Sequence, residues 1–288
     1  MKMTDIEITK AATHYMGKPA LATVYLALFS VGAWCLAFVL VVQEVLHIGV
    51  AFVLVSYLVY STYTPLHEAV HKNISGKSRD LIWLNEVVGY LVASILGVSY
   101  TMHKAAHMRH HQNTNVPERD PDFVFSGNHL RDLLTGGVKI IANEYRDYFS
   151  DVFPNAERKE KLIVIGEICT FVGIRVLLAI EYPVETMLLG VLTNIAGVTL
   201  LGYIFACVVH SPFDETERFR DTSTILMPKA IHGIVTRLWL WQNYHSIHHL
   251  FPRVPFFQYQ QLFEEIEDGM KERGSPIVRL GEKQPVFV

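Results

Sequence analysis

The chain has 288 residues, of which half are hydrophobic and only 18% are charged. A typical soluble protein carries about 25% charged residues, so this composition predicts a membrane protein. The chain is too apolar to be disordered, and its net charge of −3 argues against nucleic acid as a partner. Its three cysteines all lie in apolar stretches and are too few for a disulfide framework or a four-cysteine iron–sulfur cluster.

Four apolar segments are long enough to cross a bilayer as helices. They are residues 21–42, 48–64, 162–180 and 186–209. A helix over residues 21–42 would rise about 33 Å, which exceeds the bilayer core of about 30 Å. Short loops at 43–47 and 181–185 join the segments in pairs. We therefore predict an all-α integral membrane fold, a single domain over residues 1–288, in which four transmembrane helices form two hairpins beneath a cytoplasmic helical cap.

A fifth apolar stretch, residues 81–100, contains the polar residues Asn85 and Glu86. If it crossed the membrane, the histidine clusters on its two sides would lie on opposite faces. We expect these clusters to work together, so we predict an interfacial or re-entrant helix here.

The basic residues predict the orientation of the chain. None of the 25 Lys and Arg lies in the loops 43–47 and 181–185, and Arg175 alone lies within one of the four spans. By the positive-inside rule, both termini and the segment between the second and third spans are cytoplasmic. Arg175 lies near the outer end of its helix, from where its side chain can reach the membrane surface. We expect a protein of the bacterial inner membrane with a cytoplasmic active site.

Three histidine clusters lie on the predicted cytoplasmic side, while His14, His47, His129 and His232 lie outside them. Within each cluster the spacing is three or four residues, which places side chains on one helical face with Cβ atoms about 5–6 Å apart. Neutral imidazole binds iron, zinc, copper and nickel. Eight imidazoles exceed what one ion can coordinate, so the pattern predicts two metal ions. The clusters are His67 and His71; His107, His110 and His111; and His245, His248 and His249.

In this order and spacing, the clusters resemble the histidine boxes of the membrane fatty acid desaturase superfamily, which includes acyl desaturases, alkane hydroxylases, and carotenoid hydroxylases and ketolases. The resemblance covers roughly residues 60–274 and includes Asp120-Pro121-Asp122. It implies a centre of two Fe ions, with O2 as co-substrate, held by the eight clustered histidines. It also implies a ninth ligand, for which His210 is the candidate. Some relatives carry an Asn one turn before that histidine, whereas this chain has Ala206.

Polar side chains beside metal-binding imidazoles normally orient them. Asp120 and Asp122 are the leading candidates for this role, although a turn around Pro121 would also explain them. His103, one turn before the second cluster, is such a neighbour, a ligand, or simply an exposed side chain. Asn113, Asn115 and Asn243 are further candidates.

The resemblance implies O2-dependent oxidation of an unactivated C–H bond in a long apolar lipid, which iron supports and redox-inert zinc does not. The tail from His248 to Pro276 resembles carotenoid ring hydroxylases, so we expect a carotenoid ring to be hydroxylated. Acyl desaturases share much of this tail, and fatty acyl desaturation is the alternative. The chain lacks a dinucleotide fingerprint and a cytochrome b5 haem segment, so we expect a separate ferredoxin, rubredoxin or cytochrome to supply electrons.

A membrane metal-binding or transport protein without redox chemistry is the rival interpretation. Transport favours ionisable ligands placed along the spans. In this chain the histidines gather at one end of the predicted spans, which favours an enzyme.

Overall fold

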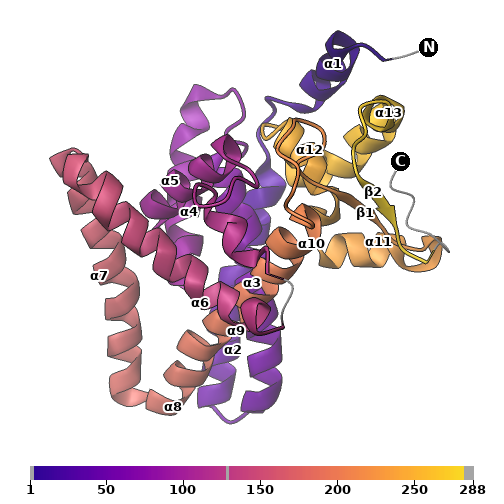
Figure 1. Ribbon diagram of the computed structural model, residues 1–288. Helices are drawn as coiled ribbons and strands as arrows, with labels where there is room; N and C mark the ends of the chain where they lie inside the picture. Colours follow the sequence, from indigo (N-terminus) through magenta and orange to yellow (C-terminus); the bar gives the residue numbers. More distant parts are fainter. Residues whose placement is uncertain (1–2, 128–129, 282–288) are drawn as a thin grey trace.

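The computed structural model describes residues 3–127 and 130–281, so His129 lies outside the described residues. Most of the chain is helical (Figure 1). The predicted spans match α2 (Leu21–Val42), α3 (Ile48–Val70), α7 (Arg158–Glu181) and a continuous helical stretch from Pro183 to His210. These four helices are long and apolar enough to cross a bilayer.

Three of the four spans depart from the predicted limits: α7 begins four residues before the predicted start at Leu162, and the fourth begins three residues before Thr186. α3 continues six residues past the predicted end at Thr64, because its last turns are buried rather than exposed to water. His67 therefore lies on the span itself. The stretch from Pro183 contains two wider π-helical segments among its elements: α8 (Pro183–Glu185), η5 (Thr186–Leu192), α9 (Thr193–Leu201), η6 (Gly202–Cys207) and α10 (Val208–His210).

The fifth apolar stretch is not one helix over residues 81–100, so that prediction extends too far. α4 (Ile82–Leu96) ends where Gly97 adopts a left-handed backbone conformation with φ of 73°. Ser99 then accepts a hydrogen bond from the Met102 N–H and begins α5 (Tyr100–Gln112). The two helices meet at 96°, and if they form one broken span the total becomes five.

Arg175 points into the protein instead of reaching for the membrane surface. Its guanidinium donates to the carbonyls of Ser94, Ile95 and Gly190 at 2.8–3.0 Å. Two of these carbonyls lie in the last turn of α4, where a helix has unpaired acceptors and a negative dipole end. Arg175 therefore fastens α7 and the fourth span to the end of α4.

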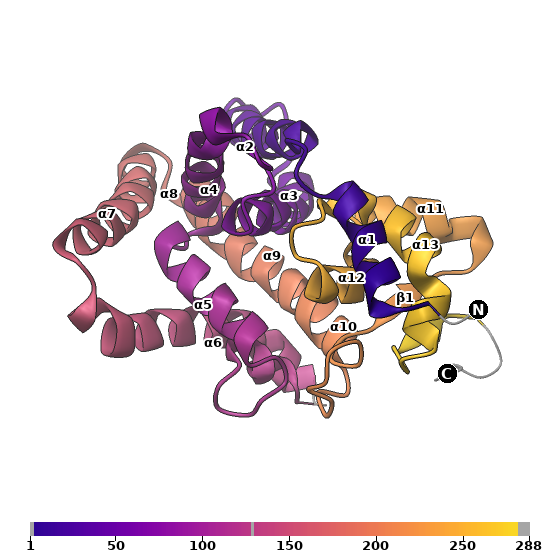
Figure 2. The same cartoon turned by 90° about the horizontal axis from the view of Figure 1, so that it is seen from above.

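α3 is the central helix and packs against α2, α4 and α9. Figure 2 shows α9 between α3 and α6 (Leu130–Asp147). Gly197 allows the close approach of α9 to α3, since a Cβ there would lie 2.7 Å from the Ser56 carbonyl oxygen. The outward faces of α2 and α7 expose large apolar side chains such as Phe29 and Leu177, as lipid-facing helices do.

After the fourth span the chain folds over one end of the helices. Figure 1 places α1 (Asp5–Tyr15), α12 (His245–Leu250) and α13 (Tyr259–Lys271) at the end opposite α8. This region also holds two parallel strands, β1 (Thr224–Leu226) and β2 (Ile277–Arg279), with Thr224 opposite Ile277. The all-α prediction is wrong for these six residues, because pairing of two distant segments leaves no periodic signal in three-residue strands. The remaining elements are η1 (Arg79–Leu81), η2 (Pro121–Phe125), η3 (Tyr148–Val152), η4 (Phe153–Asn155), α11 (Lys229–Leu238), η7 (Gln242–Tyr244) and η8 (Phe256–Gln258).

Candidate metal centre

The structure brings the nine predicted histidine ligands together as two adjacent groups of ring nitrogens. Within each group, one nitrogen per residue lies within 4.8 Å of all the others. Group 1 contains His67, His71, His107, His111 and His248, and group 2 contains His110, His210, His245 and His249.

The two groups share the helices that carry the second and third clusters. On α5, His107 and His111 are one turn apart and face group 1, while His110 faces group 2. α12 does the reverse, with His248 in group 1 and two histidines in group 2. α5 and α12 therefore each contribute histidines to both groups.

In group 1 the Nε2 atoms form a chain of close contacts. His67 and His248 are 2.9 Å apart, His248 and His111 2.9 Å, His111 and His107 3.0 Å, and His107 and His71 2.9 Å. In group 2 the Nε2 atom of His249 lies 3.1 Å from that of His245 and 3.3 Å from that of His110.

These spacings suit nitrogens that share a metal ion. An ion bound about 2.1 Å from each imidazole nitrogen sets neighbouring nitrogens about 3.0 Å apart at right angles and about 3.4 Å apart in a tetrahedron. The observed 2.9–3.3 Å contacts lie within about 0.1 Å of this range. The residues present therefore fit two metal ions, one in each group.

Polar partners behind the rings orient the Nδ1 atoms of several of these histidines. The Nδ1 of His110 lies 2.7 Å from Asp120 Oδ1, and that of His210 lies 3.2 Å from the Asn115 side-chain oxygen. A ring that donates through Nδ1 keeps a lone pair on Nε2, which is the form that binds metal. The Nε2 of His210 is buried and has no hydrogen-bond partner within residues 3–127 and 130–281. This nitrogen is therefore available to bind a metal ion.

Burial favours neutral rings in the third cluster. Loss of water, reinforced by the neighbouring imidazoles, lowers the pKa of His245, His248 and His249 well below its usual value. Burial also raises the pKa of Asp221 to about 6, and its carboxylate lies 3.4 Å from the Nδ1 of His249. Neutral imidazoles with carboxylates behind them are the arrangement that a cation requires.

A buried polar link holds the third cluster against the end of α3. Glu68, between the two histidines of the first cluster, accepts a hydrogen bond from the Asn73 side chain at 3.0 Å. Asn73 also donates to the carbonyl of Pro252 at 3.0 Å. This link joins chain segments that are about 180 residues apart, so it sets how the first and third clusters face each other.

The other predicted site residues have different positions. Asp120 contacts His110 and also accepts from the Asp122 N–H at 2.9 Å, so it both orients a ring and begins η2. Asp122 lies 3.7 Å from the His110 Nδ1. His103 belongs to neither group and pairs with Glu144. The Asn243 side chain donates to the Ile225 carbonyl and the Thr236 hydroxyl, away from the histidines.

Sequence reasoning missed two partners of the site. Tyr259 places its hydroxyl 3.1 Å from the Nδ1 of His248, and Glu144 pairs with His103. Tyr259 lies in the tail that follows the third cluster, but nothing in its spacing marks it as a contact. Glu144 lies in a segment without any motif, and only the fold brings it to His103.

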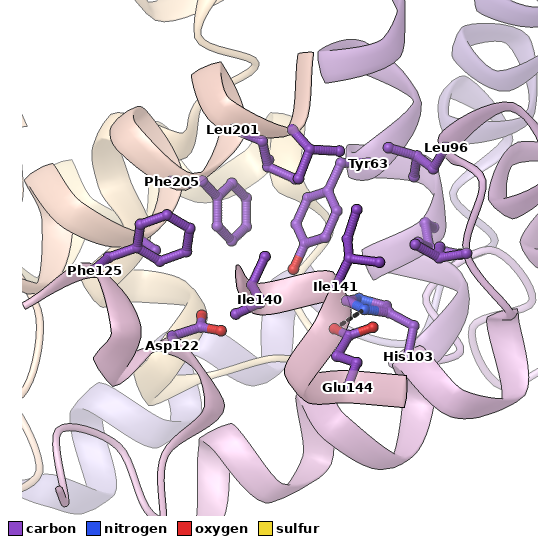
Figure 3. A pocket seen from close by; sticks show the side chains of 15 residues that line it. Tyr63, Leu96, His103, Asp122, Phe125, Ile140, Ile141, Glu144, Leu201 and Phe205 are labelled. Carbon is purple, nitrogen blue, oxygen red and sulfur yellow. Dashed lines mark hydrogen bonds and ion pairs between the residues drawn. The ribbon is translucent and has the colours of Figure 1, made fainter. Parts of the chain in front are cut away.

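A largely apolar pocket adjoins the histidines (Figure 3). Tyr63, Leu96, Phe125, Ile140, Leu201 and Phe205 are among its lining residues. The Phe205 ring contacts His67 of group 1 and His245 of group 2, with ring centroids 5.3 Å and 4.6 Å apart. The pocket is therefore separated from both groups by one aromatic ring. Asp122, His103 and Glu144 form its polar part.

Helices long enough to cross a membrane thus stand beside two groups of converging imidazoles in this protein. Residues 44–281 match the family model for fatty acid desaturases, so the chain belongs to the fatty acid desaturase family. It is similar to two proteins of Haematococcus lacustris, "Beta-carotene 4-ketolase 3" and "Beta-carotene ketolase", at 30% identity over 82 residues in each case. Each match covers 28% of this chain and 25% of the relative, so the similar segment spans a quarter of the relatives' length.

Proposed function

We propose that this protein is an oxidoreductase that oxidises an unactivated C–H bond of a long apolar membrane lipid, with two Fe ions and O2. The observation that carries the proposal is an apolar pocket whose wall residue Phe205 contacts both groups of converging histidines. The family match supports the reaction class.

The five histidines of group 1 and the four of group 2 would each hold one iron. Iron supplies the redox chemistry with O2 that a side chain cannot perform on an unactivated carbon. Asp120, Asn115 and Tyr259 fix the rings of His110, His210 and His248 through their Nδ1 atoms. These contacts keep the Nε2 lone pairs directed at the two ions before substrate arrives.

The pocket residues would bind the lipid and exclude water. Leu96, Ile140 and Leu201 offer apolar surface, and Tyr63 and Phe205 form the wall next to the histidines. A substrate carbon that rests on this wall lies beside both groups. Apolar walls also keep bulk water from competing for the oxidant, which an oxidation of a C–H bond requires.

We propose a carotenoid ring as the substrate and hydroxylation as the reaction. The similarity to two beta-carotene ketolases supports a carotenoid, although it covers only part of each chain. Fatty acyl desaturation is the second candidate, and the family match favours it. Both reactions begin with removal of hydrogen from carbon, so the position of the substrate in the pocket decides the product.

The proposed topology has two hairpins, α2 with α3 and α7 with α8–α10, and an interfacial or re-entrant α4. Both termini and the histidine cap face the cytoplasm of a bacterial inner membrane. The lack of Lys and Arg in the loops 43–47 and 181–185 supports this orientation. A separate ferredoxin, rubredoxin or cytochrome would dock on the cytoplasmic cap and supply the electrons. The chain would act as a single membrane domain.

The test is expression in a host that makes β-carotene, together with a ferredoxin and its reductase. Mass spectrometry would measure pigments and fatty acids in the same extract. A gain of one oxygen per ring supports hydroxylation, whereas unchanged pigments with new acyl double bonds support desaturation. His249→Ala should abolish either product, and His14→Ala, at an exposed position on α1, should not. If the His249→Ala variant remains active, the histidine groups are not the site.

A further inference from the structure

The apolar pocket has one polar wall, which the proposed oxidation does not require. His103, Asp122 and Glu144 form it, and Figure 3 shows His103 and Glu144 side by side. The side chains of His103 and Glu144 are each only 9% exposed. Placing ionisable groups in an apolar cavity costs free energy unless their polar atoms are paired. A cluster of this kind in a pocket is therefore a candidate for ligand recognition.

One atom of this wall lacks a partner. The Nδ1 of His103 lies 3.0 Å from Glu144 Oε1, so the imidazole donates to the carboxylate and the ring is held in place. Its Nε2 is buried and makes no hydrogen bond with any residue that the structure describes. Buried polar atoms are almost always paired, with protein, ordered water or ligand. In the described part of the chain, this nitrogen of a pocket-lining residue therefore lacks the hydrogen-bond partner that a buried polar atom normally has.

His103 is close to the site of reaction without belonging to either histidine group. Its ring stacks on that of His107, with centroids 5.8 Å apart. It also meets the edge of Tyr63, a wall residue that stacks on His67. A polar atom bound to His103 would thus lie next to the carbon that rests on the Tyr63 wall.

We propose that His103, positioned by Glu144, binds a hydroxyl group on an otherwise apolar substrate. The inference rests on the proposed function, in which this pocket holds the lipid. A hydroxyl both donates and accepts, so it can pair with the open Nε2 at small cost in desolvation. A carboxylate or phosphate would meet the carboxylates of Asp122 and Glu144, and a pure hydrocarbon such as β-carotene would bind more weakly because it leaves the nitrogen unpaired.

The test compares a ring-sized alcohol with its hydrocarbon. Trimethylcyclohexanol and trimethylcyclohexane are titrated into the purified full-length protein in nanodiscs without an electron donor, so that no turnover occurs, and binding is measured by the shift in unfolding temperature. We expect the alcohol to bind about tenfold more tightly, as one buried hydrogen bond to an otherwise unpaired atom allows. Equal affinities would overturn the hydroxyl site, with water alone as the partner of Nε2, but leave the pocket assignment intact. If neither compound binds, both the inference and the proposed substrate pocket fail.

Variants assign the preference to His103. His103→Leu should remove the roughly tenfold preference by weakening the alcohol alone, and His103→Gln should retain part of it because its amide still forms a hydrogen bond. His14→Leu, the same exchange at an exposed position, should keep the full preference. If the preference survives in His103→Leu, the assignment to His103 is wrong. If the His103→Leu protein does not fold, the assignment to His103 is decided by comparing the alcohol preference of His103→Gln with that of the wild-type protein.

Discussion

Phe125 lies between two glycines, and this arrangement makes Gly202→Ala a sharp test of the packing beside the pocket. A Cβ at Gly202 would lie 2.1 Å from Phe125 Cζ, and one at Gly136 would lie 2.3 Å from Phe125 Cε1. Carbon atoms in contact are about 3.5 Å apart, so the new methyl group would overlap the ring by about 1.4 Å. Phe125 is only 3% exposed, and Gly136 lies close to the ring as well. The ring therefore has little space into which it could move. We expect the free energy of unfolding to fall by about 1–3 kcal/mol, the usual cost of overpacking a core.

The assay is thermal unfolding of the purified protein in detergent, with Gly173→Ala as the matched control. Gly173 lies on α7 with nothing within 4 Å of its added Cβ among the described residues, so alanine should raise stability there through its higher helix propensity, by up to about 1 kcal/mol. The two substitutions should therefore shift the unfolding temperature in opposite directions. In a Phe125→Leu background, Gly202→Ala should cost at least about 1 kcal/mol less. Equal stability of the Gly202→Ala and Gly173→Ala proteins would refute the overlap argument.

Two further predictions concern the metal centre and the topology. Asp120→Asn should weaken metal retention about 10- to 100-fold in competition with a chelator, because His110 loses the carboxylate that orients it. Asp268→Asn, at an exposed position on α13 outside both histidine groups, should have no effect, and equal losses would contradict the role of Asp120. In a cysteine-free background, cysteines at Val45 and Val184 should react with an impermeant reagent from outside the cell, and protection of either in intact cells would contradict the orientation.

The helices that are long and apolar enough to cross a membrane could be located before the fold was known, because an uninterrupted apolar run is itself the signal for them. α2 begins and ends at the predicted residues. The predicted helix ends and the predicted direction of Arg175 were wrong where contacts within the protein, and not lipid, surround the chain. α3 continues past Thr64 because its last turns are buried in protein, and α4 stops at Leu96 because Gly97 takes a left-handed conformation. Arg175 turns inward because unpaired carbonyls at the end of α4 accept its hydrogen bonds.

Histidine spacing of three and four residues predicts which side chains gather, since it fixes a common face on one helix. Spacing says nothing about rotation of one helix against another. Helix packing places His110 in the second group, apart from His107 and His111, pairs His103 with Glu144, and directs Asn243 away from the histidines. The physical reason is that convergence of side chains from distant segments depends on helix packing and on buried links such as the one from Asn73 to Pro252.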